Sequence, residues 1–138
     1  MTKPSPDSQT EPVIRVMMMP RDTNAENTIF GGVILSYLDQ AGAIQARKLG
    51  CRRIVTVAMN SVEFKQPVFV GDVLSFRAQT LSVGRSSAHI KIMVEAERFE
   101  PLGQRVPVTE AEVVYVAIDE NRRPVPFDQC AVDGGPGG

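Results

Sequence analysis

The spacing of apolar positions changes once along the chain, from a helical period to a strand period. Between Val33 and Leu49, apolar side chains recur at the intervals of one helix face, and further apolar residues widen that face. A helix that is apolar around most of its circumference is buried on most sides. A short apolar run over 13–19 precedes this helix and predicts a first strand, which Pro20 interrupts.

After Gly50 the apolar positions alternate, which predicts strands. Residues 53–59 form a β-branched run, and longer alternating runs follow at 72–83, 86–99 and 106–118. Strands of about 12–14 residues span roughly 40 Å, whereas about 17 helical residues span only about 25 Å. A sheet that is longer than the helix it covers has to curve. The sequence therefore predicts an α+β fold in which a long, curved antiparallel sheet wraps around one central helix.

The two ends of the chain differ in composition from its middle. Residues 1–12 are rich in Pro, Ser, Thr and charge, and residues 129–138 end in a glycine-rich run. Neither segment can bury enough apolar surface to offset the entropy lost on ordering. We therefore predict a disordered N-terminal tail over 1–12, a single domain over 13–128 and a flexible C-terminal tail over 129–138.

Charge and cysteine content exclude several classes of protein. The 138-residue chain has 15 Lys and Arg against 16 Asp and Glu, which argues against a nucleic acid or an acidic membrane as partner. No run reaches the roughly 20 apolar residues of a membrane span, and the first residues lack the apolar segment of a secretory signal. Cys51 and Cys130 form no CxxC motif, so we predict free cysteines, no zinc site and a cytoplasmic protein.

Asp39 is the first candidate for chemistry. It lies in the middle of the predicted helix, at the border of the apolar face, with no Lys or Arg three or four residues away. A carboxylate in that position can serve in proton transfer. A solvated surface carboxylate is an equal alternative, because Asp and Glu are mostly exposed.

Gly31 and Gly32 stand directly before the predicted helix. Glycine lets a ligand approach closely, and the free N–H groups of a helix start favour negative charge, so the pair could form an oxyanion hole. A glycine cap with tight packing is the alternative. In the preceding loop, Asn24 is also a common turn former.

A tight turn around Gly84 joins two of the predicted long strands. Arg85, Ser86 and Ser87 follow this glycine and could hold a phosphate through charge-assisted and hydroxyl hydrogen bonds. A solvated hairpin tip is the alternative. His89, the one histidine of the chain, falls on the polar side of a strand and is predicted to be a sheet-surface residue.

Several short motifs, taken in order, resemble the signature of bacterial hotdog-fold acyl-CoA thioesterases, in particular the YciA-like acyl-CoA hydrolase branch. The resemblance extends from about Val13 to Asp119. The matching stretches lie at 19–25, 29–32, 38–43, 55–58, 64–67, 70–73 and 83–87. Their order and spacing together are more specific than any one of them.

The resemblance implies a hotdog fold and the hydrolysis of fatty acyl-CoA thioesters to free acid and CoA. It implies that Asp39 acts as general base on water or as a direct nucleophile. Asn24, supplied across a dimer interface, would position the water or the substrate. Gly31 and Gly32 would offer backbone N–H groups to the thioester oxygen. No metal and no cofactor are implied, since coenzyme A is part of the substrate and of the product.

The same resemblance implies where coenzyme A lies and how the chain assembles. Arg85, Ser86 and Ser87 fall where the family contacts coenzyme A, and Lys65 is a further candidate for a phosphate. At least a homodimer is implied, with a trimer of dimers as the larger assembly. The chain departs from the family at Gln66, where a basic residue is expected, and after Asp119, where relatives carry a charged helix.

Two other functions belong to proteins of this fold. A hydratase or dehydratase would pair an Asp with a catalytic His near the helix, whereas His89 is predicted in a strand. A non-catalytic acyl-CoA-binding or regulatory module is the main alternative. Such proteins tend to carry an additional DNA-binding domain, for which residues 13–128 leave no room.

Overall fold

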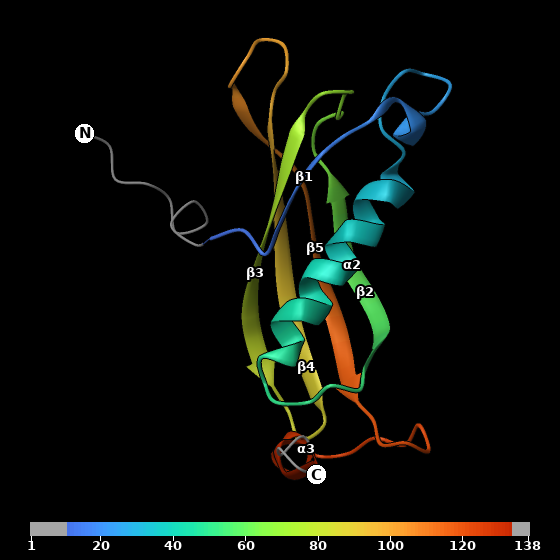
Figure 1. The fold of residues 1–138 in the computed structure, drawn as a ribbon, viewed down its shortest axis with the longest axis vertical. Helices are drawn as coiled ribbons and strands as arrows, with labels where there is room; N and C mark the ends of the chain where they lie inside the picture. Colours follow the sequence, from blue (N-terminus) through green and yellow to red (C-terminus); the bar gives the residue numbers. More distant parts are fainter. Residues whose placement is uncertain (1–10, 134–138) are drawn as a thin grey trace, which may run out of the picture.

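The computed structural model describes residues 11–133, in which one face of a curved antiparallel sheet packs against one long helix (Figure 1). The long helix is α2, Gly31–Arg47, and the 3-10 turn η1, Pro20–Asp22, precedes it. The strands of the described residues lie in the order β1-β3-β4-β5-β2. Their bounds are β1 Ile14–Met17, β2 Ile54–Phe64, β3 Val73–Val83, β4 Ser87–Glu97 and β5 Arg105–Ala117.

Alternating side chains of the long strands form the core under α2. Every second residue of β4 from Ala88 to Ala96 is buried, while His89 is exposed on the opposite face, as predicted. From the helix, Ile34 and Leu38 enter the same core. Burial of one such aliphatic side chain contributes about 1.5–3 kcal/mol. The two periodicities of the sequence thus meet in one apolar layer between helix and sheet, which confirms the predicted α+β architecture.

Strand β2 extends five residues beyond its predicted end at Met59. Register shifts between Thr56 and Ala58, and again between Asn60 and Glu63, interrupt its pairing with β5. Most of its second half is exposed. Past Met59, β2 has no buried face, and its apolar residues do not alternate regularly. The sequence pattern therefore ends at Met59, although the strand continues to Phe64. The first strand, in contrast, ends at Met17, two residues before its predicted end.

The prediction of free cysteines is wrong, and the first part of the predicted C-terminal tail has secondary structure. Residues Phe127–Asp133 form a short helix, α3, where the composition predicts a flexible tail from 129 onward. Cys51 and Cys130 are not free but form a disulfide, 79 residues apart in sequence. The pair is buried with Phe127 in a small apolar cluster at the end of the sheet. Sequence spacing carries no signal for such a pair, because only the fold brings the two segments together.

Residues 1–10 and 134–138 lie outside the described residues, so the predicted disorder of both tails stays a prediction there. Glu11 and Pro12, also part of the predicted N-terminal tail, are described and belong to no helix or strand. Within residues 11–133, no helix is long and apolar enough to cross a membrane.

Replacing Cys130 with Ser is expected to lower the free energy of unfolding by about 2–4 kcal/mol, because the disulfide closes a long loop and restricts the unfolded chain. Urea unfolding of oxidised wild type, reduced wild type and Cys130→Ser measures this effect. The reduced wild type is the control, and it should unfold at the same urea concentration as the variant. Equal stability of all three proteins would contradict a stabilising disulfide.

Candidate active site

Asp39 lies in the middle of α2, and its carboxylate is held by two hydroxyl groups. The Oδ1 atom accepts a hydrogen bond from Thr56 Oγ1 at 2.7 Å and lies 3.1 Å from the hydroxyl oxygen of Tyr115. The Tyr115 hydroxyl also donates to the backbone carbonyl of Asp39 at 2.8 Å. The other oxygen, Oδ2, accepts no hydrogen bond from any residue in the described part of the chain. Asp39 therefore presents one free carboxylate oxygen.

The sheet brings the two hydroxyl groups to Asp39. Thr56 on β2 and Tyr115 on β5 are partners across the β2–β5 ladder, and both donate toward the helix. We call Asp39, Thr56 and Tyr115 the carboxylate cluster. Sequence reasoning missed Thr56 and Tyr115, because each is an ordinary strand residue and only the register places them opposite each other. The Asp39 carboxylate lacks a charged helical neighbour, as the sequence predicts, but it is not without partners.

Burial and the neighbouring Asp39 carboxylate raise the pKa of Tyr115 above its usual range. The side chain has no exposed surface, and an ionised phenol there would lose its hydration beside a negative charge. The hydroxyl therefore stays protonated and acts as a donor over the whole working range of pH.

The raised pKa of Tyr115 predicts a loss of stability in alkali. Above pH about 10 the unfolded chain releases this proton whereas the folded chain keeps it, so the free energy of unfolding falls as pH rises. Urea unfolding of wild type and Tyr115→Phe at pH about 8 and about 10.5 measures the effect. The variant should lose less stability between the two pH values than wild type. An equal loss in both proteins would contradict the prediction.

The start of α2 offers backbone donors. Phe30 precedes the helix and caps it with no side-chain hydrogen bond, and the N–H groups of Gly31 and Gly32 have no acceptor among the described residues. A Cβ on Gly31 would come within 3.0 Å of the Phe64 ring, whereas one on Gly32 would meet nothing within 4 Å. A side chain at Gly32 would therefore face open space, whereas one at Gly31 would press on Phe64.

Asn24 closes the loop before this helix start. Its Oδ1 atom accepts from the backbone N–H groups of Glu26 at 2.8 Å and Thr28 at 3.2 Å, and its Nδ2 donates to Thr28 Oγ1 at 2.9 Å. This is the turn-forming role that the sequence also allowed. The amide keeps one further N–H for a ligand, since an NH₂ group has two hydrogens. We call Asn24, Gly31 and Gly32 the helix-start cluster.

A buried ion pair fixes the loop on which the helix start rests. Arg98 Nη1 lies 2.7 Å from Asp72 Oδ2 and donates to the Pro67 carbonyl at 2.8 Å. In the same loop, the Val68 carbonyl accepts from the N–H of Ile29 at 2.8 Å. A buried pair of this kind is costly to break, because the charge that remains is left without a partner. The chain entering α2 is therefore held at a defined position.

A largely apolar cavity of about 360 Å³ adjoins the helix-start cluster. Apolar side chains make up much of its wall, and Lys65 and Gln66 add polar groups. Its lining residues are Thr28, Ile29, Gly31, Ile34, Phe64, Lys65, Gln66, Pro67 and Val68. The Lys65 ammonium lies 3.3 Å from Glu110, and both side chains are partly exposed. An anion at Lys65 would therefore compete with this carboxylate.

Arg85, Ser86 and Ser87 lie at the other end of the helix. Gln45, near the C-terminal end of α2, donates to Thr80 of β3 at 3.2 Å, just before the turn that carries Arg85. The Arg85 carbonyl in turn accepts from the N–H of Phe127 at 3.0 Å, so α3 supports this turn (Figure 1). Within one chain, the structure therefore separates these three residues from the helix-start cluster.

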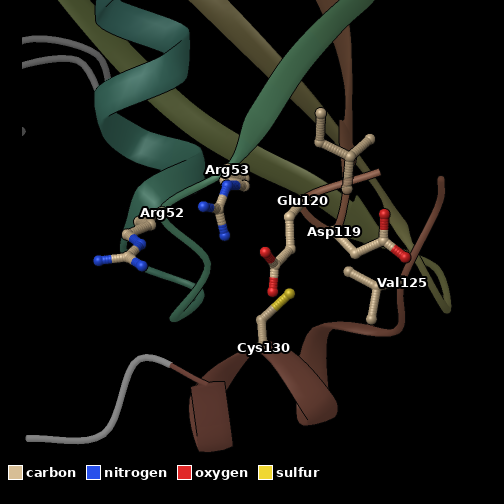
Figure 2. A pocket seen from close by; sticks show the side chains of 7 residues that line it. Arg52, Arg53, Asp119, Glu120, Val125 and Cys130 are labelled. Carbon is tan, nitrogen blue, oxygen red and sulfur yellow. The ribbon is translucent and has the colours of Figure 1, made fainter. Parts of the chain in front are cut away.

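A second cleft of about 360 Å³ lies beside the disulfide (Figure 2). It combines two guanidinium groups with two carboxylates, and none of the predicted site residues lines it. The lining residues are Arg52, Arg53, Ile118, Asp119, Glu120, Val125 and Cys130. Asp119 Oδ1 already accepts from the N–H groups of Asn121 and Arg123. In residues 11–133, no group of three or more His, Cys, Asp or Glu side chains is arranged to hold a metal ion.

Comparison with known proteins places this chain among thioesterases. The thioesterase superfamily model matches residues 26–99. The acyl-CoA thioester hydrolase YciA of Escherichia coli is 42% identical over 118 residues, 84% of this chain and 89% of that protein. A hexameric broad-specificity acyl-coenzyme A thioesterase superposes with a TM-score of 0.80 at 43% identity, over 86% of this chain and 81% of that one. A hexameric hotdog-fold thioesterase of Campylobacter jejuni superposes with a TM-score of 0.79 at 38% identity, over 91% of this chain and 97% of that one.

Proposed function

Because this chain belongs to the thioesterase superfamily and is a hotdog-fold acyl-CoA thioester hydrolase, we propose that Asp39 carries the hydrolytic step. One observation supports this assignment above all. Thr56 and Tyr115 hold Oδ1, while Oδ2 is left without a partner among the described residues. A carboxylate anchored on one oxygen and open on the other is suited to meet a water molecule or a thioester carbon.

Two routes lead from Asp39 to products. As general base, Oδ2 takes a proton from water while the water oxygen bonds to the thioester carbon. The C–S bond then breaks, and the departing CoA sulfur takes up a proton. As nucleophile, Oδ2 itself bonds to that carbon and displaces the CoA thiolate, and water then hydrolyses the mixed anhydride. Single-turnover hydrolysis in ¹⁸O-water tests the second route: ¹⁸O in the Asp39 carboxylate would establish it, because the label can enter Asp39 only when water attacks the Asp39 carbon of the anhydride.

The backbone N–H groups of Gly31 and Gly32 would stabilise the oxyanion, and Asn24 would position the water or substrate. Asp39 lies eight residues after Gly31, about 12 Å along the helix axis. A base and an oxyanion donor that act on one carbonyl group lie within roughly 9 Å of each other, because the three contacts base–water, water–carbonyl and carbonyl–donor are about 3 Å each. The two clusters of one chain are therefore too far apart for a single thioester.

A second copy of the chain would complete the site. The unpaired edge of β2 is long for an edge strand and exposes Val57, Val62 and Phe64, and such an edge is a template for pairing with another chain. Pairing of two copies would bring the carboxylate cluster of one toward the helix-start cluster of the other. A homodimer is thus the catalytic unit. The solved relatives named above are hexameric, which supports a trimer of dimers for this chain.

The substrate is an acyl-CoA thioester, and coenzyme A enters only as part of substrate and product. The apolar cavity beside Gly31 suits an acyl chain. Arg85, Ser86 and Ser87 would bind the CoA moiety, with Lys65 as a further phosphate contact. Since the turn of Arg85 lies at the opposite end of α2 from this cavity, a substrate held by both places of one chain would extend along the helix, whereas a more compact one would use groups of two subunits. A cytoplasmic location stays a prediction, and the argument from free cysteines no longer supports it.

Mixing two inactive variants tests the shared site. Asp39→Asn removes the base, and Gly32→Pro removes a backbone N–H group. Unfolded together and refolded, the two chains should recover activity in about one quarter of the sites, because each mixed dimer regains one intact site. The separately refolded variants are the controls. If the rate of thiol release from acyl-CoA after mixing equals that of the separately refolded variants, the two clusters act within one chain. Acyl-CoA binding without thiol release by wild type would instead indicate a non-catalytic module.

A further inference from the structure

Tyr115 is the largest fully buried side chain of the described residues, and its one polar atom faces Asp39. The hydroxyl oxygen lies 2.8 Å from the backbone carbonyl oxygen of Asp39 and 3.1 Å from Oδ1 of the same residue. A phenol has one hydrogen, so this hydrogen is shared between two acceptors, with the carbonyl the closer one. Tyr115 therefore contacts both the main chain and the side chain of the proposed catalytic residue.

The helix has a gap where this hydroxyl approaches. Gly42 lies one turn after Asp39, and a Cβ at that position would come within 2.7 Å of Cζ of the Tyr115 ring and closer still to its hydroxyl. Real Cβ atoms essentially never lie so near another atom. Glycine in the interior of a helix is destabilising relative to alanine. The chain nevertheless carries glycine here, and only glycine leaves room for the contact.

The two hydroxyl donors differ in how firmly they are held. Thr56 lies on β2, which has a strand neighbour on one side only within its own chain, whereas Tyr115 lies on β5, between β4 and β2 of the same chain, with no exposed surface. A buried ring packed on all sides keeps one rotamer. Of the two donors, Tyr115 is therefore the one that defines the position of the carboxylate relative to the sheet.

We propose that Tyr115 is a positioning residue for thioester hydrolysis, which holds Asp39 through its carbonyl and Oδ1 so that Oδ2 faces the reacting water or carbon. The proposal rests on the proposed role of Asp39. Tyr115 has no exposed surface, and its hydroxyl is directed at Asp39, so it would act on the reaction only through this carboxylate. Its hydroxyl should therefore affect the chemical step and leave substrate binding unchanged, because small displacements of a catalytic group lower the rate of a reaction far more than they lower affinity.

Tyr115→Phe tests the proposal, because it removes the hydroxyl and keeps the ring. With an acyl-CoA substrate, kcat should fall about three- to tenfold while KM stays within about twofold. The control is Tyr37→Phe, which alters the other tyrosine of the chain, on α2 and in contact with Phe76. This control should keep both constants. Thermal unfolding of each variant verifies that it is folded.

The Asp39→Asn background shows whether Tyr115 acts through Asp39. There, Tyr115→Phe should cause no further loss of the residual rate, since the positioned carboxylate is already absent. Gly42→Ala is a second route to the same effect, because its Cβ displaces the Tyr115 hydroxyl without removing it. This variant should lower kcat, and adding Tyr115→Phe to it should lower kcat little more.

The outcomes separate this proposal from the proposed function. Wild-type kcat in Tyr115→Phe, together with an inactive Asp39→Asn, overturns the positioning role and leaves Asp39 as the catalytic residue. The positioning role is also overturned if Tyr115→Phe lowers kcat by the same factor in the Asp39→Asn background as in wild type, because Tyr115 would then act through the fold alone. An active Asp39→Asn overturns the proposed function itself.

Discussion

Replacing Asp39 with Asn is expected to lower kcat for acyl-CoA hydrolysis by about 10²–10⁴-fold, the usual contribution of a positioned general base. The amide has the shape of the carboxylate, and its oxygen can still accept hydrogen bonds from Thr56 and Tyr115. The fold should therefore be retained. What the variant loses is the negative charge on the free oxygen, which either takes a proton from water or bonds to the thioester carbon.

Thiol release from a panel of acyl-CoA esters of increasing chain length measures this loss. Asp128→Asn is the matched control, since it makes the same substitution at an exposed carboxylate of α3. The control should keep wild-type rates on every substrate. Asp39→Asn should lose activity on all of them, because the step it affects is common to all chain lengths. Turnover by Asp39→Asn near the wild-type rate would show that another group activates the water.

Gly32→Pro is expected to lower kcat by about 10²–10³-fold, the cost of removing one oxyanion donor. Proline lacks the backbone N–H group but is tolerated in the first turn of a helix, where that group has no helical partner. Gly32 is the second residue of α2, and a Cβ there meets nothing within 4 Å. The substitution therefore removes a hydrogen-bond donor with little change in packing.

Gly32→Ala separates the loss of the donor from the loss of glycine. Alanine keeps the N–H group and fits the same open space, so this variant should retain activity within a few-fold of wild type. Circular dichroism of both variants shows whether α2 is intact. If alanine and proline lower kcat equally, the small size of Gly32, and not its N–H group, is what the reaction requires.

The boundaries of the long elements were predictable because they depend on local pattern. The helix begins at Gly31 in place of Val33, and the three long strands match their predicted ranges within two residues. In each of these elements one face is buried, so apolar residues recur in the sequence with the period of that element. Strand β2 lies at the sheet edge and is mostly exposed, so its second half shows no such period.

The candidate site was predictable only in part. Asp39, Gly31 and Gly32 are recognisable because their places in one helix follow from local sequence. Thr56 and Tyr115 were missed, since each lies in a strand and approaches Asp39 only through the β2–β5 register. Their hydrogen bonds with Asp39 join residues that are far apart along the chain. The periodicity of apolar residues carries no information about such long-range contacts.

The sequence by itself determined the fold class of this protein, one helix buried by a long antiparallel sheet, because burial of one face imposes a period on each element. Only the tertiary structure decided which residues meet. It joined Cys51 to Cys130, placed Thr56 and Tyr115 on Asp39, and separated the turn of Arg85 from the start of α2. These are long-range contacts set by strand register and chain path, whereas periodicity reports only which side of an element faces the core.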